Sequence, residues 1–282
     1  MVTKQSHEGV ATFVINNIKN FILDLVRSRS LIMDLAIRDY KQQNQGSYLG
    51  LVWNYLQPLL FVAVLYSVFT LGFRSGNDDN DMPFSLYLIS GMICWLYFTA
   101  NLTSITGVIR AYSFLVKKVD FRLSILPIVK LISSFLPHVV LLLIVIGLGF
   151  YQGINPGLHT LQFLYYYGCM IVLLMGLGWL TASTSIFVKD VSNVVSIITQ
   201  FGFWLTPIFW HIESMPEKVQ RILKLNPVYY LVTGYRDAIT GGIYFWQRPI
   251  QEGLSFWIVT SVFFVLGALV FKRLKPHFSE VI

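Results

Sequence analysis

Long apolar runs separated by short polar stretches dominate the chain. Six of these runs hold about 20 mostly apolar residues each, the length that an α-helix needs to cross the hydrocarbon core of a bilayer. They are Leu51–Phe73, Phe84–Ile109, Leu126–Phe150, Phe163–Val188, Val191–Trp210 and Leu254–Phe271. A transmembrane β-barrel would instead show segments of about ten residues in which apolar and polar positions alternate. The pattern therefore predicts an all-α integral membrane protein with six transmembrane helices.

Two further stretches have apolar residues at helical spacing with charges between them. The first, from about Phe13 to Tyr40, fits an amphipathic helix that lies in the cytoplasmic membrane interface, next to anionic lipid head groups. The second, residues 215–242, predicts two short helices that are interrupted at Asn226-Pro227. The expected organisation is an N-terminal region (1–49), a six-span domain (50–271) and a tail (272–282).

Composition confirms that the bilayer, rather than water, is the solvent for most of the chain. Of 282 residues, 55% are hydrophobic and 12% are charged, and the mean hydropathy is +0.62. Soluble proteins carry about a quarter charged residues. These values exclude soluble enzymes, disordered tails and secreted disulfide scaffolds.

The net charge of +7 is open to two interpretations, nucleic-acid binding or basic cytoplasmic loops, and the positions of the charges favour the second. Lys and Arg gather in the N-terminal region, the loop 110–124, Lys189 and the tail. The first predicted external loop has one Arg and three Asp, and the third loop has no Lys or Arg. Both termini are therefore predicted to be cytoplasmic, with no nucleic-acid partner. The basic stretch Ile212–Gly253 argues against this orientation.

The sequence contains few signals of catalytic chemistry. A nucleotide-binding G-x-x-x-x-G-K-[ST] motif, an H-E-x-x-H motif and a nucleophile elbow are all missing from it. Asp79-Asn80-Asp81 matches the D-x-D of metal-dependent glycosyltransferases, but its short external loop favours a solvated turn. We expect no catalytic residue, metal site or cofactor in this chain. The predicted spans also lack Asp, Glu, Lys and Arg at their centres, which argues against ion-driven transport.

Aromatic residues make up 16% of the chain. An aromatic belt at the two membrane interfaces accounts for most of them. A second interpretation is that some line a passage, because aromatic faces bind the C–H faces of sugar rings. The candidates for this role are Tyr165, Tyr166, Phe201, Phe203 and Trp204.

Four groups of motifs, spread over most of the chain, carry a family resemblance. They are Ile37-Arg38-Asp39-Tyr40 with Gly46–Trp53 and Gln57-Pro58; Lys117-Lys118-Val119 with Ile125-Leu126-Pro127; Lys189-Asp190-Val191 with Leu205–Phe209; and Leu225-Asn226-Pro227 with Gly234–Asp237. With these motifs the chain resembles the membrane subunits of polysaccharide-export ABC transporters of the type-2 exporter class. This family includes O-antigen, capsule and teichoic-acid permeases. One departure is Phe121-Arg122-Leu123, where the family often has Phe-Pro-Leu.

The resemblance implies a homodimer of this chain, paired with two ABC ATPase subunits that use ATP and Mg²⁺. Such a complex moves a lipid-diphosphate-linked polysaccharide outward across the bacterial inner membrane. Two alternatives remain open: a type-2 ABC permease for a lipid or drug, and an integral-membrane enzyme that modifies glycans.

The same resemblance assigns roles to three groups of residues. The loop 110–124, with Lys117, Lys118, Asp120, Phe121 and Arg122, is expected to be a stiff coupling segment against the ATPase subunits. Arg38 and Lys41 are placed to attract the lipid diphosphate at the cytoplasmic opening, with plain surface charge as an equal alternative. The two short helices within 215–242 are expected to re-enter the membrane as an external gate, with its residues Asn226, Pro227, Tyr235, Arg236 and Asp237. A buried Arg236 or Asp237 must pair with the other or with a neighbour.

Overall fold

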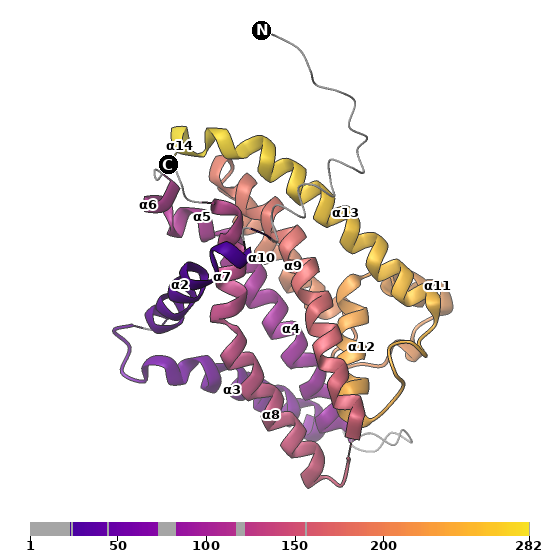
Figure 1. The fold of residues 1–282 in the computed structure, drawn as a ribbon. Helices are drawn as coiled ribbons and strands as arrows, with labels where there is room; N and C mark the ends of the chain where they lie inside the picture. Colours follow the sequence, from indigo (N-terminus) through magenta and orange to yellow (C-terminus); the bar gives the residue numbers. More distant parts are fainter. Residues whose placement is uncertain are drawn as a thin grey trace.

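The computed structural model describes residues 23, 25–43, 45–72, 83–116, 122–155 and 157–281. Every regular element within these ranges is a helix, as the apolar runs predict. The helices form a bundle in which α4, α9 and α12 lie inside and α3, α8 and α13 lie further out (Figure 1). The Asp79-Asn80-Asp81 turn lies outside the described residues.

Five helical segments in the described chain are long and apolar enough to cross a membrane. They are Gly50–Ser67, Phe84–Thr106, Leu123–Tyr151, Gly157–Phe187 and Ile250–Val281. Each contains the central part of one predicted span. The remaining predicted span, Val191–Trp210, corresponds to α10 (Asp190–Leu205), which has 16 residues and a length of about 24 Å at 1.5 Å per residue. The described chain is thus all-helical, with five candidate membrane spans.

The main helices of these segments have clear bounds. They are α3 (Trp53–Ser67), α4 (Phe84–Thr106), α7 (Leu126–Ser133), α8 (Phe135–Tyr151), α9 (Gln162–Phe187) and α13 (Ile250–Leu274). A π-helical turn, Val68–Gly72, extends α3, and 3₁₀ turns precede α3 (Gly50–Val52), α7 (Leu123–Ile125) and α9 (Gly157–Leu161).

Prolines explain two departures from the predicted span boundaries. The third run is divided into α7 and α8 at Ser134. Pro137 has no N–H to donate to the carbonyl of Ser133, so the regular hydrogen-bond ladder is interrupted there. The fifth run stops being helical at Leu205 because Thr206, which precedes Pro207, is extended with ψ of 131°.

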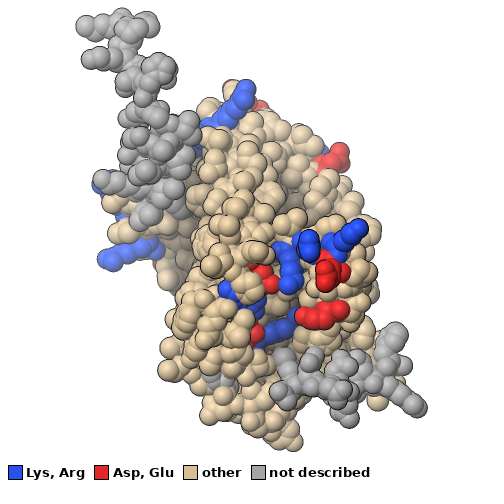
Figure 2. Space-filling view, turned by 90° about the vertical axis from the view of Figure 1, so that its right-hand side faces the viewer, with Lys and Arg blue, Asp and Glu red and all other residues tan. Residues whose placement is uncertain are grey.

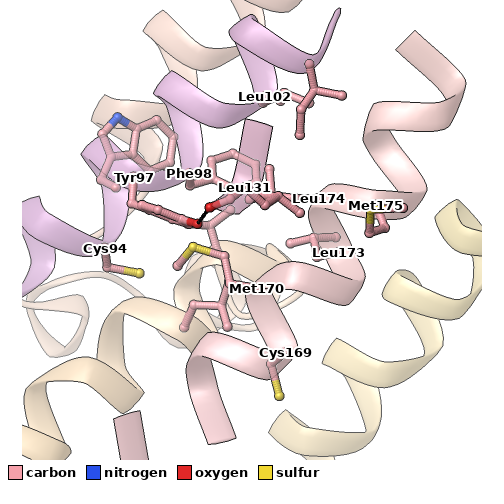
Figure 3. Close-up of a cluster of buried hydrophobic side chains, with 14 of the residues drawn as sticks. Cys94, Tyr97, Phe98, Leu102, Leu131, Cys169, Met170, Leu173, Leu174 and Met175 are labelled. Atoms are coloured by element: carbon pink, nitrogen blue, oxygen red, sulfur yellow. Dashed lines mark hydrogen bonds between the residues drawn. The ribbon is translucent and has the colours of Figure 1, made fainter. Parts of the chain in front are cut away.

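The core forms where α4, α7 and α9 pack together. Figure 3 shows its sulfur-containing and aliphatic side chains converging from these helices around Tyr97, which donates a hydrogen bond to the carbonyl of Leu131 at 3.1 Å. Cys94 and Cys169 are both buried and reduced in this core. A thiol in such surroundings behaves as a small apolar group.

Glycines allow the closest helix contact, between α9 and α13. A Cβ atom on Gly267 would lie 2.1 Å from the carbonyl oxygen of Gly176, and a Cβ atom on Gly176 would lie 2.6 Å from the backbone nitrogen of Phe264. Small residues at such crossings let membrane helices approach backbone to backbone. The position of α13 therefore depends on these two glycines.

Several short elements lie together at one end of the bundle. They are α5 (Val108–Ala111), α6 (Ser113–Val116), a 3₁₀ turn (Lys275–His277) and α14 (Phe278–Val281). Arg110 of α5 donates to the carbonyl of Ile186 at the end of α9, and Phe278 of α14 packs on Phe187. α13 begins on the side of the molecule where α11 lies and ends here, next to α14 (Figure 1).

On that opposite side, two short helices stand where the sequence predicts them. They are α11 (Glu217–Leu223) and α12 (Pro227–Thr240), preceded by a 3₁₀ turn (Ile212–Ser214). The break between the helices falls at Asn226-Pro227, as predicted. Asn226 caps α12 by accepting a hydrogen bond from the N–H of Val228 at 3.0 Å, and Gly241 ends the helix in the left-handed conformation with φ of 70°.

The predicted interfacial helix is described in its second half as α2 (Arg29–Gln42). Its inward face carries Ile32 and Ala36, which pack on Ile125, just before α7, and on Val129 in α7. Its other faces, including Arg38, are exposed. The first part of the predicted helix, residues 13–22, lies outside the described residues.

Candidate functional site

Arg236 is the most buried cation in the described chain and holds the irregular segment that follows α10. Its side chain, only 6% exposed, donates to the carbonyls of Pro207 at 2.7 Å and Ile208 at 2.8 Å. It also lies over the ring of Tyr87, 3.5 Å from the centroid, and donates to the Tyr87 carbonyl at 3.3 Å. A Cβ atom on Gly91 would come within 2.9 Å of the guanidinium. The cation thus joins α12, the end of α10 and α4.

Asp237 pairs with a neighbour rather than with Arg236. It accepts a hydrogen bond from Arg248, which also reaches Glu252 of α13 at 3.2 Å. Glu252 in turn pairs with Lys224 at 3.1 Å. This chain of ion pairs connects α12, the start of α13 and the end of α11. Figure 2 shows basic and acidic side chains gathered on the face that includes α11.

The other predicted gate residues lie around the same helix. The amide of Asn226 donates to the hydroxyl of Thr206 at 2.9 Å, so it ties the start of α12 to the end of α10. Pro227 occupies the first turn of α12. Tyr235 is fully buried, and its hydroxyl lies 3.0 Å from Nε2 of His138 in α8. The structure therefore brings all five predicted gate residues onto or beside α12.

A groove of about 770 Å³ opens between α3, α4 and the junction of α7 with α8. Aromatic rings, among them Trp53 and Tyr97, stand beside neutral polar side chains such as Gln57, Thr103 and Ser104. Gln57, Thr103 and Ser104 are exposed. All lining residues that the structure describes are uncharged. Rings and neutral hydrogen-bonding groups together suit a polyhydroxylated ligand, because aromatic faces meet C–H groups and amides or hydroxyls meet sugar hydroxyls.

The five aromatic candidates for a passage fall into two places. Tyr166 is buried against Gly234, and Tyr165 stacks on Phe245 at 4.1 Å between ring centroids, so both lie within the packing of α9. Phe201 and Trp204 are exposed on α10. Phe203, on the same helix, contacts Phe61 of α3 and Trp95 of α4, with centroids 6.3 and 6.2 Å apart. Of the α10 candidates, Phe203 thus faces α3 and α4, whereas Phe201 and Trp204 face away from the bundle.

The predicted basic residues near the cytoplasmic opening are exposed where the structure describes them. Arg38 and Lys41 lie on the outer faces of α2, and Arg122, from the predicted coupling segment, is exposed before α7. At the end of α2, the hydroxyl of Tyr40 lies 3.0 Å from that of Tyr55 in α3. Burial and this hydrogen bond raise the pKa of Tyr40 to about 12. Lys117, Lys118, Asp120 and Phe121 lie outside the described residues.

Comparison with known protein families identifies one family whose model spans these features. Residues 31–240 match the family model described as ABC-2 type transporter. The chain belongs to the ABC-2 type transporter family. The match runs from α2 to the end of α12, so it includes the groove, α10 and the Arg236 contacts.

Curated relatives of this ABC-2 chain share its length. It is 24% identical over 253 residues to the O-antigen export system permease protein RfbA of Klebsiella pneumoniae, covering 89% of this chain and 95% of that protein. It is 25% identical to the protein of the same name from Myxococcus xanthus, covering 93% and 98%. It is 24% identical to the polysialic acid transport protein KpsM of Escherichia coli, covering 78% and 83%.

Three charged residues of this ABC-2 chain that form buried or partly buried ion pairs are not among the predicted site residues. Asp39 appeared only as part of a family motif, although it is buried. Arg248 counted only as one of the basic residues of Ile212–Gly253, and Glu252, at the start of the last span, carried no prediction. Their spacing of four residues, with the cation first and the acid inside the first helical turn, is a signal that could have pointed to a pair.

Proposed function

We propose that this chain is the transmembrane subunit of an ATP-driven exporter of lipid-diphosphate-linked polysaccharide. The polysaccharide is of the O-antigen, capsule or teichoic-acid type and moves outward across the bacterial inner membrane. The observation that carries the proposal is the similarity, over 78% to 93% of this chain, to relatives named for two kinds of polysaccharide export. The family match over 31–240 places the chain among transporters, which supports a non-catalytic role.

The uncharged groove favours a glycan over a charged drug as the moving group. Its exposed amides and hydroxyls stand beside aromatic rings within apolar spans. Polar groups at that depth are unfavourable unless water, a ligand or protein satisfies them. The exposed cations Arg38 and Lys41 stand on α2, whose C-terminal neighbour Gln43 lines the groove. A diphosphate held by these cations would place its first sugars at the groove.

A homodimer accounts for the surface of α10. Its residues Asn193 and Gln200 are exposed on a helix whose other side exposes Ile198 and Phe201. Lipid can cover the apolar side but is a poor environment for the polar side. A second copy of the chain, with a wet passage between the copies, would cover both. Phe201 and Trp204 would then stand along the passage.

The proposed topology is argued from the positions of the basic elements at one end of the bundle. With α10 counted as a sixth span, the basic elements α2 and α5 and the basic end of α13 (Lys272, Arg273) would fall on the cytoplasmic side together with both termini. Residues 206–210 would complete the crossing begun by α10. The pair α11 and α12 would then re-enter the membrane from outside, and Arg236 would hold the external gate shut by binding the end of α10.

Energy would come from two ABC ATPase subunits, which bind ATP and Mg²⁺. The sequence of this chain has no nucleotide-binding motif of its own. The loop 110–124, with Lys117, Lys118, Asp120, Phe121 and Arg122, is the proposed contact with these subunits. The exposed faces of α2 provide a second contact.

Inside-out membrane vesicles provide a direct test of the function. The chain and its ATPase partner are co-expressed, and a radiolabelled lipid-linked glycan is supplied on the outer, formerly cytoplasmic, face. We expect ATP, but not a non-hydrolysable analogue, to move the glycan into a compartment that an added glycosidase cannot reach. Equal protection in vesicles that lack this chain would refute the proposal. ATP-dependent movement of the lipid carrier without its glycan would instead support a lipid permease.

A further inference from the structure

A buried carboxylate ties three separate segments together at the end of the bundle where α5 and α6 lie. Asp39 of α2 is 7% exposed. It accepts hydrogen bonds from the Lys130 ammonium at 2.5 Å, the Ser133 hydroxyl at 2.7 Å and the Tyr112 hydroxyl at 3.0 Å. Lys130 and Ser133 belong to α7, and Tyr112 stands between α5 and α6. The proposed function gives this cluster no role.

The cluster extends an apolar contact between the same two helices. Ile32, Ala36 and Asp39 are spaced four and three residues apart, so they lie on one face of α2. The first two pack on Ile125, just before α7, and on Val129 of α7. Apolar contact is non-directional and leaves a helix some freedom to slide. Three donors converging on one carboxylate remove that freedom, because each hydrogen bond needs a defined direction.

The positions of the donors along the chain show which segments Asp39 connects. Tyr112 comes just before residues 117–121, and Lys130 comes shortly after them, so both flanks of the loop 110–124 are tied to the same side chain. Burial, followed by the charge of Asp39 and its hydrogen bond, raises the pKa of Tyr112 above its usual range. Tyr112 thus stays a hydrogen-bond donor at physiological pH. Lys130 also lies 5.7 Å from the centre of the Tyr112 ring.

We infer that Asp39 is a positioning residue that makes α2, the flanks of the loop 110–124 and α7 move as one body. This inference rests on the proposed function, in which the ATPase subunits push on that loop and on α2. Because α7 leads directly into α8, displacement of the loop reaches the groove wall at Ser134 and His138. Without Asp39, the loop could move while α7 stays still, and ATP would be hydrolysed with little transport.

The transport test uses the reconstituted complex of the full chain with its ATPase subunits. Asp39→Asn keeps the shape of the side chain and removes its charge. We expect at least a tenfold fall in glycan moved per ATP hydrolysed, while ATP hydrolysis stays within about twofold of wild type. The matched control is Asp34→Asn, an exposed carboxylate on the same helix, which should leave the ratio unchanged. An unchanged ratio in Asp39→Asn would overturn the inference.

A second variant covers the case in which Asp39→Asn fails to assemble because the partly buried Lys130 is left without a counter-charge. Asp39→Asn combined with Lys130→Met removes both charges, so assembly should recover while the transport-to-hydrolysis ratio stays low. Recovery of the ratio in this double variant would show that packing alone transmits the motion, against our inference.

Hydrogen exchange separates this inference from the proposed function. In the purified complex, amides of α2 should exchange at least tenfold faster in Asp39→Asn than in wild type or Asp34→Asn. Unchanged exchange would refute the link between α2 and α7 whatever the substrate. A wild-type complex that shows this protection but moves no glycan would refute the proposed function and leave the link standing.

Discussion

The helix pair α4 and α9 differs sharply from the pair α3 and α10, although all four are apolar. Within their most apolar windows, 67% of the α4 span and 61% of the α9 span are buried, compared with 6% of the α3 span. Val62 is the one fully buried residue described in α3, and Val195 is its counterpart in α10. The first pair is enclosed by its own chain, whereas the second depends on surroundings that the single chain does not provide.

This difference in burial predicts that substitutions in the first pair change stability, whereas substitutions in the second pair change transport. Substitutions in α4 and α9 should change the free energy of unfolding, because their neighbours are fixed parts of the same core. Substitutions on the outer faces of α3 and α10 should change transport while the chain stays folded, because those faces meet lipid, substrate or a second copy. Arg236 stands between the two regions, since it binds both α4 and the segment after α10.

The largest loss of stability is expected for Gly176→Ala in α9. A Cβ atom there would lie 2.6 to 2.8 Å from backbone atoms of Phe263 and Phe264, which cannot move without displacing α13. Overpacking costs about 1–3 kcal/mol, and a backbone clash belongs at or above the top of that range. Thermal unfolding of the purified chain in detergent measures the effect. The control is Gly168→Ala on the same helix, which meets open space; an equal loss there would show that the close contact is not the cause.

Arg236→Met should cause the next largest loss of stability, and it should also reduce transport, because Arg236 binds both α4 and the segment after α10. The buried carbonyls of Pro207, Ile208 and Tyr87 lose their charged donor, at an expected cost of about 2–3 kcal/mol. Export should fall by more than the loss of folded protein explains, because the end of α10 is released from α4. Quantifying surface glycan against folded subunit in the membrane tests this. Arg236→Lys keeps the charge without the guanidinium fork, so its export per folded subunit should lie between that of Arg236→Met and that of wild type. Normal export in Arg236→Met would refute a gating role.

Asn226→Ala should cost about 1 kcal/mol, because it removes the cap of α12 and the bond to Thr206. Chemical denaturation of the detergent-solubilised chain is sensitive enough to detect this. Asn193→Ala, at an exposed position on α10, provides the control and should change stability by less than about 0.5 kcal/mol. Equal values for the two variants would mean that the cap does not stabilise α12.

The smallest change in stability is expected for Gln200→Leu on α10, within about 0.5 kcal/mol of wild type because the side chain is exposed. Transport should nevertheless fall several-fold, since the polar side of α10 is the proposed border of the passage. Both quantities are measured on one reconstituted preparation. Loss of stability without loss of transport would reverse the proposed division between the two regions.

The sequence predicts the helices well because long apolar runs leave few alternatives in a membrane. It also predicts the break at Asn226-Pro227, where local chemistry decides the structure: a capping side chain followed by a residue that favours the first helical turn. The break at Ser134 follows from Pro137 by the same local argument, and was missed because the run of apolar residues continues through it. Such features depend on neighbours in the chain.

Contacts between distant segments could not be predicted in the same way. Asp39 meets partners 73, 91 and 94 residues away, and no periodicity points to them. Tyr165 and Tyr166 were predicted beside a passage, yet α9 is apolar on every side, so its pattern cannot show which face is enclosed. α10 is different: its polar and apolar sides are distinct, and two of its three candidates, Phe201 and Trp204, lie exposed, whereas Phe203 packs against the core.

Photo-cross-linking tests most directly whether the glycan moves along this chain. A benzophenone amino acid is placed at Gln57 in the groove and, separately, at Leu143, which is 62% exposed on the outer side of α8. In the reconstituted complex, we predict that radiolabelled lipid-linked glycan cross-links to position 57 and that ATP hydrolysis changes the yield, while position 143 captures only lipid. Glycan cross-linking at position 143 alone, or equally at both positions with and without ATP, would contradict the account.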